Sequence, residues 1–190
     1  SLIIKPKIEP YKAPFLTLVA GASVVKALSN LGVEASIKWP NDIIVHNKKI
    51  CGILTELSAE MERVNYVVIG IGINIKTIDF PDEIKEKATS LYKEGYKLSR
   101  VDIVRQFCIE FEKLYKGYIL DGNKQDTLEL CRKYSAIIGK QVYVIKNNKR
   151  ELVKCIDINE NGNLIVKEKN GEIQEIMSGE VSIRGVKGYV

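Results

Sequence analysis

Charged and amide side chains interrupt two neighbouring apolar segments in the first half of the chain. The first interruption is KWPND at residues 38–42, and the second segment, KICGIL at residues 49–54, opens with Lys49. Lysines, an asparagine and an aspartate that stand close together in otherwise buried strands are typical of a site that neutralises an anion. The chemistry that these residue types support is stabilisation of negative charge on a carboxylate and a phosphate together.

Each of these residues also has a plainer explanation. Pro40 cannot donate a hydrogen bond to a sheet, so the strand predicted over residues 35–45 must bend there or lie at an edge, and Pro-Asn-Asp is ordinary turn chemistry. Lys49 follows a predicted turn at residues 46–48, where a lysine is usually solvated. Gly52 leaves room for a ligand or for another backbone. Taken one at a time, these residues favour a plain turn and a solvated lysine over an anion site.

Two glycines stand inside a third predicted strand, over residues 66–75. Gly70 and Gly72 belong to GIGIN at residues 70–74, and glycine inside a strand lowers its stability. A flat ligand lying on bare backbone is one explanation, and a bulge or close helix packing is the other. The segment is not a dinucleotide-binding fingerprint, because no third glycine and no helix follow it, and it is not a Walker loop.

The elements that must position these residues follow from hydrophobic periodicity. We expect a buried helix over residues 16–31, a loop over residues 76–98 with a short helix at 81–87, and a long helix capped by Ser99 that ends near Gly122. The predicted strands of this part cover residues 2–5, 35–45, 50–57 and 66–75. The predicted apolar stripe of the long helix comprises Val104, Phe107, Cys108, Phe111, Leu114, Tyr115 and Tyr118. A second helix is expected over residues 125–134.

The last fifty residues have a different character. Short strands are expected there, divided by polar turns, and Asn170-Gly171 is a strong hairpin signal. They cover residues 141–145, 151–158, 164–167, 173–177 and 181–183. Five short strands in this length indicate a small antiparallel barrel. The predicted fold class is therefore α+β, with a mixed sheet and packed helices over residues 1–136 and a small β-barrel domain over residues 137–190.

Composition excludes several classes of protein. The 190 residues carry a net charge of +5, from 29 basic and 24 acidic side chains, with no block of like charge. This excess would suit an anionic ligand, but a solvated lysine-rich surface explains it better, and it is no DNA-binding patch. Cys51, Cys108, Cys131 and Cys155 lie far apart and His46 is the one histidine, so we expect no zinc site and free thiols, with Cys108 and Cys131 on apolar helix faces. The chain has no run of about 18 apolar residues, so we expect no membrane span.

Taken together, KWPND at residues 38–42, the pattern Lys49-x-x-Gly52-Ile53-Leu54-x-Glu56 and GIGIN at residues 70–74 resemble the biotin protein ligases, also called biotin–[acetyl-CoA-carboxylase] ligases. The order and the gaps of the three blocks match that family. SGEVSIR at residues 178–184 is similar to its Gly-Gly-Glu-(Ile/Val)-Ser-(Leu/Val)-Arg segment. The resemblance implies a class II synthetase-like catalytic fold followed by an SH3-like barrel.

The resemblance also implies a two-step cytoplasmic reaction. Biotin attacks the α-phosphate of Mg-ATP to form biotinyl-5′-adenylate, and a lysine of a biotin carboxyl carrier protein then takes the biotin. It implies that Lys49, Lys38 and Asp42 are catalytic and that Lys49 and Gly52 contact biotin. It implies that ATP is bound by Lys38, Asn41, Gly70, Gly72 and Asn74. It assigns no residue to magnesium.

One departure from the family pattern lies at the start of the chain. The family's glycine- and arginine-rich biotin loop should precede Ser1, so we expect residues 1–190 to hold part of the biotin pocket and to need the remainder in cis or from a companion chain. A homodimer is possible in this family, and nothing in the chain resembles the helix-turn-helix element of its repressor members. The alternative functions are a lipoate- or octanoyl-type ligase of related fold and an inactive regulatory fragment.

Overall fold

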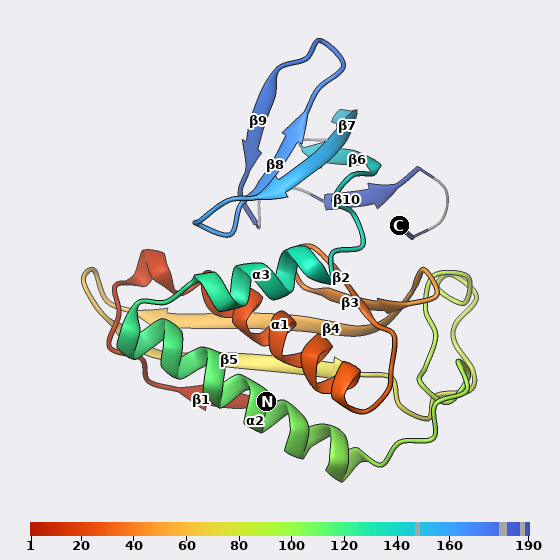
Figure 1. The fold of residues 1–190 in the computed structure, drawn as a ribbon, viewed down its shortest axis with the longest axis horizontal. Helices are drawn as coiled ribbons and strands as arrows, with labels where there is room; N and C mark the ends of the chain where they lie inside the picture. The colour runs from red at the N-terminus through yellow and green to blue at the C-terminus, as the bar shows by residue number, and fades with distance from the viewer. Residues whose placement is uncertain (147–148, 179–181, 187–188) are drawn as a thin grey trace.

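The computed structural model describes residues 1–146, 149–178, 182–186 and 189–190. Within these ranges, three α-helices cover one face of a five-stranded sheet, and a second five-stranded sheet stands at the edge of this layer beside α3 (Figure 1). The predicted α+β class is confirmed, but the sheet that was predicted to be mixed is antiparallel in all of its strand pairs. The bounds of the helices are η1 (Pro10–Lys12, a short 3-10 helix), α1 (Phe15–Asn30), α2 (Arg100–Asp121) and α3 (Gln125–Lys133).

The first sheet has the strand order β1-β5-β4-β3-β2, and every neighbouring pair of these strands is antiparallel. Its strands are β1 (Leu2–Ile4), β2 (Ser36–Lys38), β3 (Asp42–Val45), β4 (Lys48–Ala59) and β5 (Val64–Ile73). Parallel pairing occurs in the described part of the chain as two single bridges, between Ile37 and Ser135 and between Lys49 and Ala88. The second of these bridges brings the β5–α2 loop against the start of β4.

The prediction of one bent strand over residues 35–45 is wrong. The chain reverses completely at residues 39–41, where the Trp39–Pro40 peptide bond is cis, so β2 and β3 are separate antiparallel strands. Since proline has no N–H to give to a ladder, a turn satisfies it better than a strand interior does. The short helix predicted at residues 81–87 is also absent, because residues 82–87 form turns.

Helix α1 is apolar on all sides because it is buried on all sides, between the first sheet and the helices α2 and α3. By length and composition alone, the segment Pro10–Asn30 passes as a membrane-span candidate, which the sequence had not predicted. That segment is 72% buried inside the structure, so the protein core explains its apolar composition.

Helix α2 begins and ends where its sequence predicts. The Ser99 hydroxyl accepts a hydrogen bond from the Asp102 N–H at 3.1 Å, and Gly122 ends the helix with φ +66°. Two residues of the predicted stripe, Val104 and Cys108, are exposed, so the prediction that they face the core is wrong. Cys131 of α3 is buried, as predicted. The buried face of α2 consists of Ile103, Phe107, Phe111, Leu114 and Tyr118.

The second sheet is antiparallel, with the strand order β10-β6-β7-β8-β9. Its strands are β6 (Gln141–Lys146), β7 (Lys149–Ile158), β8 (Leu164–Lys167), β9 (Ile173–Ile176) and β10 (Ser182–Gly185). Each strand overlaps one of the predicted segments, with ends that differ by at most two residues, and residue 181 lies outside the described part of the chain.

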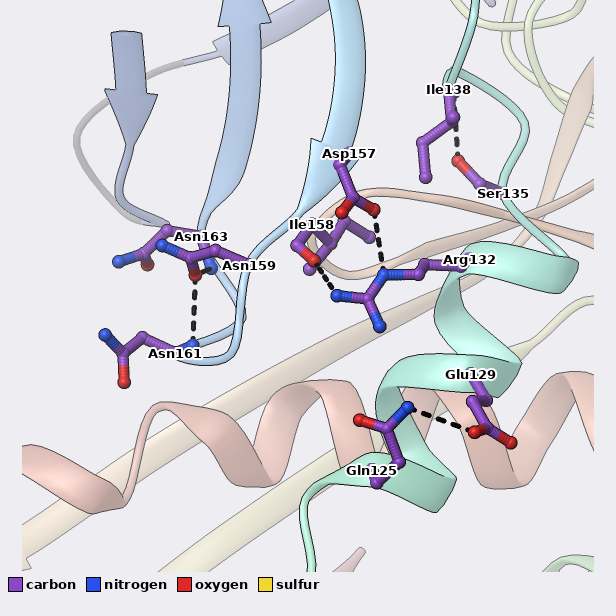
Figure 2. Close-up of polar contacts among 10 residues, drawn as sticks. All are labelled: Gln125, Glu129, Arg132, Ser135, Ile138, Asp157, Ile158, Asn159, Asn161 and Asn163. Atoms are coloured by element: carbon purple, nitrogen blue, oxygen red, sulfur yellow. Dashed lines mark hydrogen bonds and ion pairs between the residues drawn. The ribbon is translucent and has the colours of Figure 1, made fainter.

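Side chains from both layers hold the second sheet in place. Arg132 of α3 donates from Nε to Asp157 Oδ1 at 2.8 Å and from its terminal nitrogen to the carbonyl of Ile158 (Figure 2). On the same side, the buried Trp39 donates its indole N–H to the carbonyl of Gly162 at 2.9 Å. Trp39 therefore anchors the β7–β8 turn and offers no free ring face for stacking, which agrees with a structural role.

Candidate active site

Four of the predicted site residues form one transverse row across the first sheet. Lys38 of β2 pairs in register with Asp42 of β3, Asp42 pairs with Gly52 of β4, and Gly52 pairs with Gly72 of β5. Register partners project from the same face of a sheet. The neighbouring row, which lies on the opposite face, consists of Ile37, Ile43, Cys51 and Ile73. Alternation along the strands therefore separates a polar row from a row of the core.

A β-bulge turns Lys49 toward this polar row. The register between β3 and β4 shifts between Ile43 and Ile44, so Ile43 pairs with Cys51 and Ile44 with Lys49. Ile50 is the extra residue, and both Ile50 and Cys51 are buried. With strict alternation, Lys49 would share the core face with Cys51. A bulge of this kind re-aims the side chains before it, and it explains how a lysine stands beside two consecutive core residues.

The Lys49 ammonium forms an ion pair with Asp42 Oδ1, and the lysine side chain crosses over Gly52 to reach it. A Cβ atom at Gly52 would lie 2.9 Å from Lys49 Nζ and 3.1 Å from its Cε. The close approach that glycine permits here is thus first an approach of Lys49 itself. Asp42 and Gly52 together fix the position of this positive charge.

Lys38 is almost completely buried, with 3% of its surface exposed. Its ammonium lies 3.4 Å from the centre of the Tyr189 ring, a cation–π contact. Burial lowers the pKa of Lys38 to about 8; Asp42 opposes the shift, whereas Arg184 and Lys49 add to it. Lys38 is therefore a positive charge that is lost as the pH rises through about 8.

Tyr189 is a residue of this cluster that sequence reasoning missed. Its hydroxyl donates to Asp42 Oδ2, so Asp42 is held from one side by Lys49 and from the other by Tyr189. Burial, together with this hydrogen bond, raises the pKa of the Tyr189 phenol. No periodicity or motif distinguishes Tyr189, which is 147 residues away from Asp42 in the chain.

A pocket of about 500 Å³ opens over this part of the sheet. Its charged lining residues are Lys49, Lys87 and Arg184, all of which are cations. Lys87 belongs to the β5–α2 loop and Arg184 to β10, so each sheet and the loop contributes one positive charge. Arg184 is part of the predicted motif, whereas Lys87 was not predicted. The remaining lining residues are Ile50, Cys51, Gly52, Gly72, Asn74, Ile84, Ala88 and Tyr189. The Cys51 side chain itself lies on the core face, where burial raises the pKa of its thiol to about 12, so the thiol stays protonated.

Of the two predicted asparagines, Asn74 lines the pocket and Asn41 does not. Asn74 lines the pocket and donates from its side chain to the Thr89 carbonyl at 3.1 Å. Asn41 lies outside the lining of this pocket, and its amide donates to the Ile53 carbonyl at 2.9 Å. Gly70 also lies outside that lining, two residues before Gly72 along β5, where it pairs with Leu54 of β4. The structure therefore brings Lys38, Asp42, Lys49, Gly52, Gly72 and Asn74 together and places Asn41 and Gly70 beside them.

The described residues do not offer a protein-built metal site. Within residues 1–146, 149–178, 182–186 and 189–190, no group of three or more His, Cys, Asp or Glu side chains could hold an ion. Asp42, the carboxylate of the cluster, has both oxygens engaged by Lys49 and Tyr189. This donor set suits an anionic ligand better than a bare cation.

Comparison with known families identifies two matching regions. The sequence model of the Biotin/lipoate A/B protein ligase family matches residues 1–74, and that of the Biotin protein ligase C terminal domain matches residues 137–184. The bifunctional ligase/repressor BirA of Bacillus subtilis is 39% identical over 187 residues, which is 96% of this chain and 57% of that protein. BirA of Escherichia coli is 27% identical over 180 residues, 94% of this chain and 56% of that protein.

Solved structures show the same likeness. The biotin protein ligase of Aquifex aeolicus in complex with biotin and ATP superimposes with a TM-score of 0.80, at 28% identity, over 97% of this chain and 78% of that one.

A third sequence relative matches a shorter part of the chain. The biotin–[acetyl-CoA-carboxylase] ligase of Mycobacterium tuberculosis is 34% identical over 85 residues, 43% of this chain and 29% of that protein. The chain spans 57% of the length of the BirA relatives from Bacillus that it matches.

Proposed function

Because the chain belongs to the biotin protein ligase family, we propose that the protein activates biotin with ATP and transfers it to a lysine of a carrier protein. In the first step, a biotin carboxylate oxygen bonds to the α-phosphorus of ATP, the bond from that phosphorus to the bridging oxygen of pyrophosphate breaks, and biotinyl-5′-adenylate forms. In the second step, the acceptor amine attacks the biotinyl carbonyl, AMP leaves with the bonding electrons, and the new amide nitrogen loses a proton.

The observation that carries this proposal is the placement of Lys49. Its ammonium lies across Gly52, held by Asp42, at a pocket whose charged lining groups are all cations. A carboxylate and a triphosphate repel each other, so their reaction requires a pre-placed positive charge between them. Lys49 is the group that would meet both anions, and it needs no rearrangement at the moment of reaction.

The other residues of the cluster follow as supporting roles. Lys38 adds a second charge behind Asp42, while Lys87 and Arg184 stand at the pocket wall, where the phosphate chain of ATP would extend. Gly72 leaves backbone accessible for the adenine or biotin ring, and we extend that role to Gly70. Asn41 and Asn74 would contact the nucleotide through the oxygen atoms of their amides. Magnesium would enter as the Mg-ATP complex, since the described donor set forms no cage for it.

The proposed acceptor is the biotin carboxyl carrier protein of acetyl-CoA carboxylase or of a related carboxylase. The support is that a relative is named for this reaction and that the biotin ligase structure from Aquifex aeolicus holds both biotin and ATP. A cytoplasmic location and a possible homodimer accompany the proposal as predictions.

A lipoate-type ligase is the alternative within enzymes, because the family that matches residues 1–74 includes lipoate ligases by name. Thermal unfolding separates the two when the biotin loop expected before Ser1 is supplied in cis or as a companion chain. Biotin with Mg-ATP should then raise the melting temperature, and lipoate or octanoate with Mg-ATP should not. Mass spectrometry of the same mixtures should detect biotinyl-5′-adenylate. If lipoate with Mg-ATP raises the melting temperature, biotin with Mg-ATP does not, and lipoyl-adenylate is the product, then lipoate is the substrate in place of biotin. If neither adenylate forms, the inactive regulatory fragment is favoured.

A further inference from the structure

The loop between β5 and α2 supplies one wall of the pocket, through Ile84, Lys87 and Ala88. A part-buried carboxylate, Glu94, lies behind this wall and outside the pocket lining, with 17% of its side chain exposed. None of the roles proposed above uses it. A carboxylate in such a place requires partners to compensate for its lost hydration.

Glu94 has two partners that come from different parts of the fold. Its Oε1 accepts a hydrogen bond from the Thr89 hydroxyl at 2.6 Å, and its Oε2 pairs with His46 Nδ1. His46 lies in the β3–β4 turn with φ +46°, three residues before Lys49, whereas Thr89 lies in the loop and is 2% exposed. Glu94 therefore connects the turn that precedes Lys49 to the loop segment that faces it.

The loop segment in turn holds the backbone of Lys49 on both sides. The Lys49 N–H donates to the Lys87 carbonyl at 2.7 Å, and the Lys49 carbonyl accepts from the Thr89 N–H at 2.9 Å. The Thr89 carbonyl accepts from the Asn74 side chain, which ties the same segment to the end of β5. Displacement of Thr89 would thus move the backbone of Lys49 and the wall residues between Lys87 and Thr89.

We propose that Glu94 is a positioning residue for Lys49: by holding Thr89 and the His46 turn together, it fixes the Lys49 backbone and the adjacent pocket wall. This inference rests on the proposed function, because it takes Lys49 as the group that meets the reacting anions. Small displacements of such a group have large effects on rate, since a misplacement of about 1 Å can cost about a hundredfold.

The charges around Glu94 keep it ionised. Burial alone would raise its pKa, but the hydrogen bonds from His46 and Thr89 and the charges of His46 and Lys48 outweigh that effect, and the pKa of Glu94 is lowered. An ionised carboxylate accepts from both partners at once, which a neutral side chain of the same size does less well. Gln at this position keeps an acceptor for Thr89 and loses the charge.

The test is a double-mutant cycle on the biotin-dependent ATP–pyrophosphate exchange reaction. The variants are Glu94→Ala, Thr89→Val and the double variant, with Glu94→Gln as the conservative replacement. Glu83→Ala is the matched control, since Glu83 is an exposed glutamate of the same loop. Thr89→Val keeps the buried shape of Thr89, so it carries the test if Glu94→Ala does not fold.

We expect Glu94→Ala to lower kcat/KM for ATP about tenfold or more, as for the loss of a charged hydrogen bond. Thr89→Val should lower it similarly, the double variant no further, and Glu94→Gln should recover part of the loss, while Glu83→Ala matches the wild type. Additive losses, or wild-type kinetics with only a lowered melting temperature, would overturn the proposal. A wild-type protein that lacks biotin-dependent exchange even with the expected biotin loop supplied in cis or as a companion chain would instead contradict the proposed function, so the two failures are distinct.

Discussion

Lys49 occupies the space that a side chain at Gly52 would need: a Cβ atom there would lie 2.9 Å from Lys49 Nζ. The glycine and the lysine are therefore one feature of the site. Because the ion pair with Asp42 draws the ammonium across this position, the charge can be stabilised there only while residue 52 has no side chain.

Gly52→Ala should displace the Lys49 ammonium and lower biotin-dependent ATP–pyrophosphate exchange by about a hundredfold, the scale expected for misplacement of a reacting group. The lysine end can move aside, so the melting temperature should change little. Gly117→Ala is the control: Gly117 lies within α2 with nothing within 4 Å of an added Cβ, so it should keep full activity and gain about 0.5–1 kcal/mol of stability. Equal activity of both variants would show that the contact is unimportant.

The lowered pKa of Lys38 predicts an alkaline limb in the pH profile. As the pH rises through about 8, Lys38 loses its charge in the folded protein, so kcat/KM should fall with an apparent pKa of about 8. In the unfolded chain a lysine stays protonated to about pH 10.4, so between these values the unfolded state binds more protons and the Lys38 contribution to stability rises with pH. As the pH rises from about 8 to about 10.4, kcat/KM should therefore fall while the contribution of Lys38 to the free energy of unfolding increases.

Lys38→Arg separates the charge of Lys38 from its titration. Arginine does not lose its proton in this range, so the alkaline limb should move to higher pH in this variant. An unchanged limb in Lys38→Arg would assign the titration to another group.

Tyr189 offers two separable contacts. Tyr189→Phe removes the hydroxyl that Asp42 accepts and keeps the ring over Lys38, so it should lower activity several-fold, the cost of about one hydrogen bond, without moving the alkaline limb. Tyr189→Ala also exposes Lys38 to water, and its pKa should rise toward 10.4. Profiles of kcat/KM against pH for the two variants distinguish these effects; coincident profiles would mean that the ring does not shield Lys38.

The indole of Trp39 should contribute to stability through the second sheet. Trp39→Phe removes the hydrogen bond to the Gly162 carbonyl and leaves space in a site that is 1% exposed. The expected loss is about 2–4 kcal/mol from the lost bond and the cavity, measured by urea unfolding. Tyr92→Phe is a suitable control because Tyr92 is half exposed. A loss below about 0.5 kcal/mol would show that the junction does not depend on the indole.

Several elements of this protein could be predicted from local chemistry. The cap at Ser99, the end of α2 at Gly122 and the short strands of the second sheet follow from residue types within a few positions. The buried α1 follows from its uniformly apolar composition. These predictions succeeded because the interactions that decide them are local.

The site could be predicted only in part, because its geometry depends on non-local pairing. The bulge at Ile50 reverses the side of the sheet that alternation assigns to Lys49, and it becomes apparent only once β3 and β4 are paired. The full reversal at residues 39–41, which places Lys38 opposite Asp42, was predicted as a bend. Tyr189, Lys87 and the Glu94 connection come from distant segments that carry no local signal.

The central claim is that Lys49 provides the positive charge on which adenylate formation depends. The most direct measurement is the initial rate of biotin-dependent ATP–pyrophosphate exchange for Lys49→Ala, beside the wild type and Lys113→Ala, a lysine exposed on α2. We predict that Lys49→Ala retains its fold and loses about a hundredfold to a thousandfold in rate, as for removal of a group that stabilises developing charge, while Lys113→Ala matches the wild type. Exchange by Lys49→Ala at the wild-type rate would contradict the account.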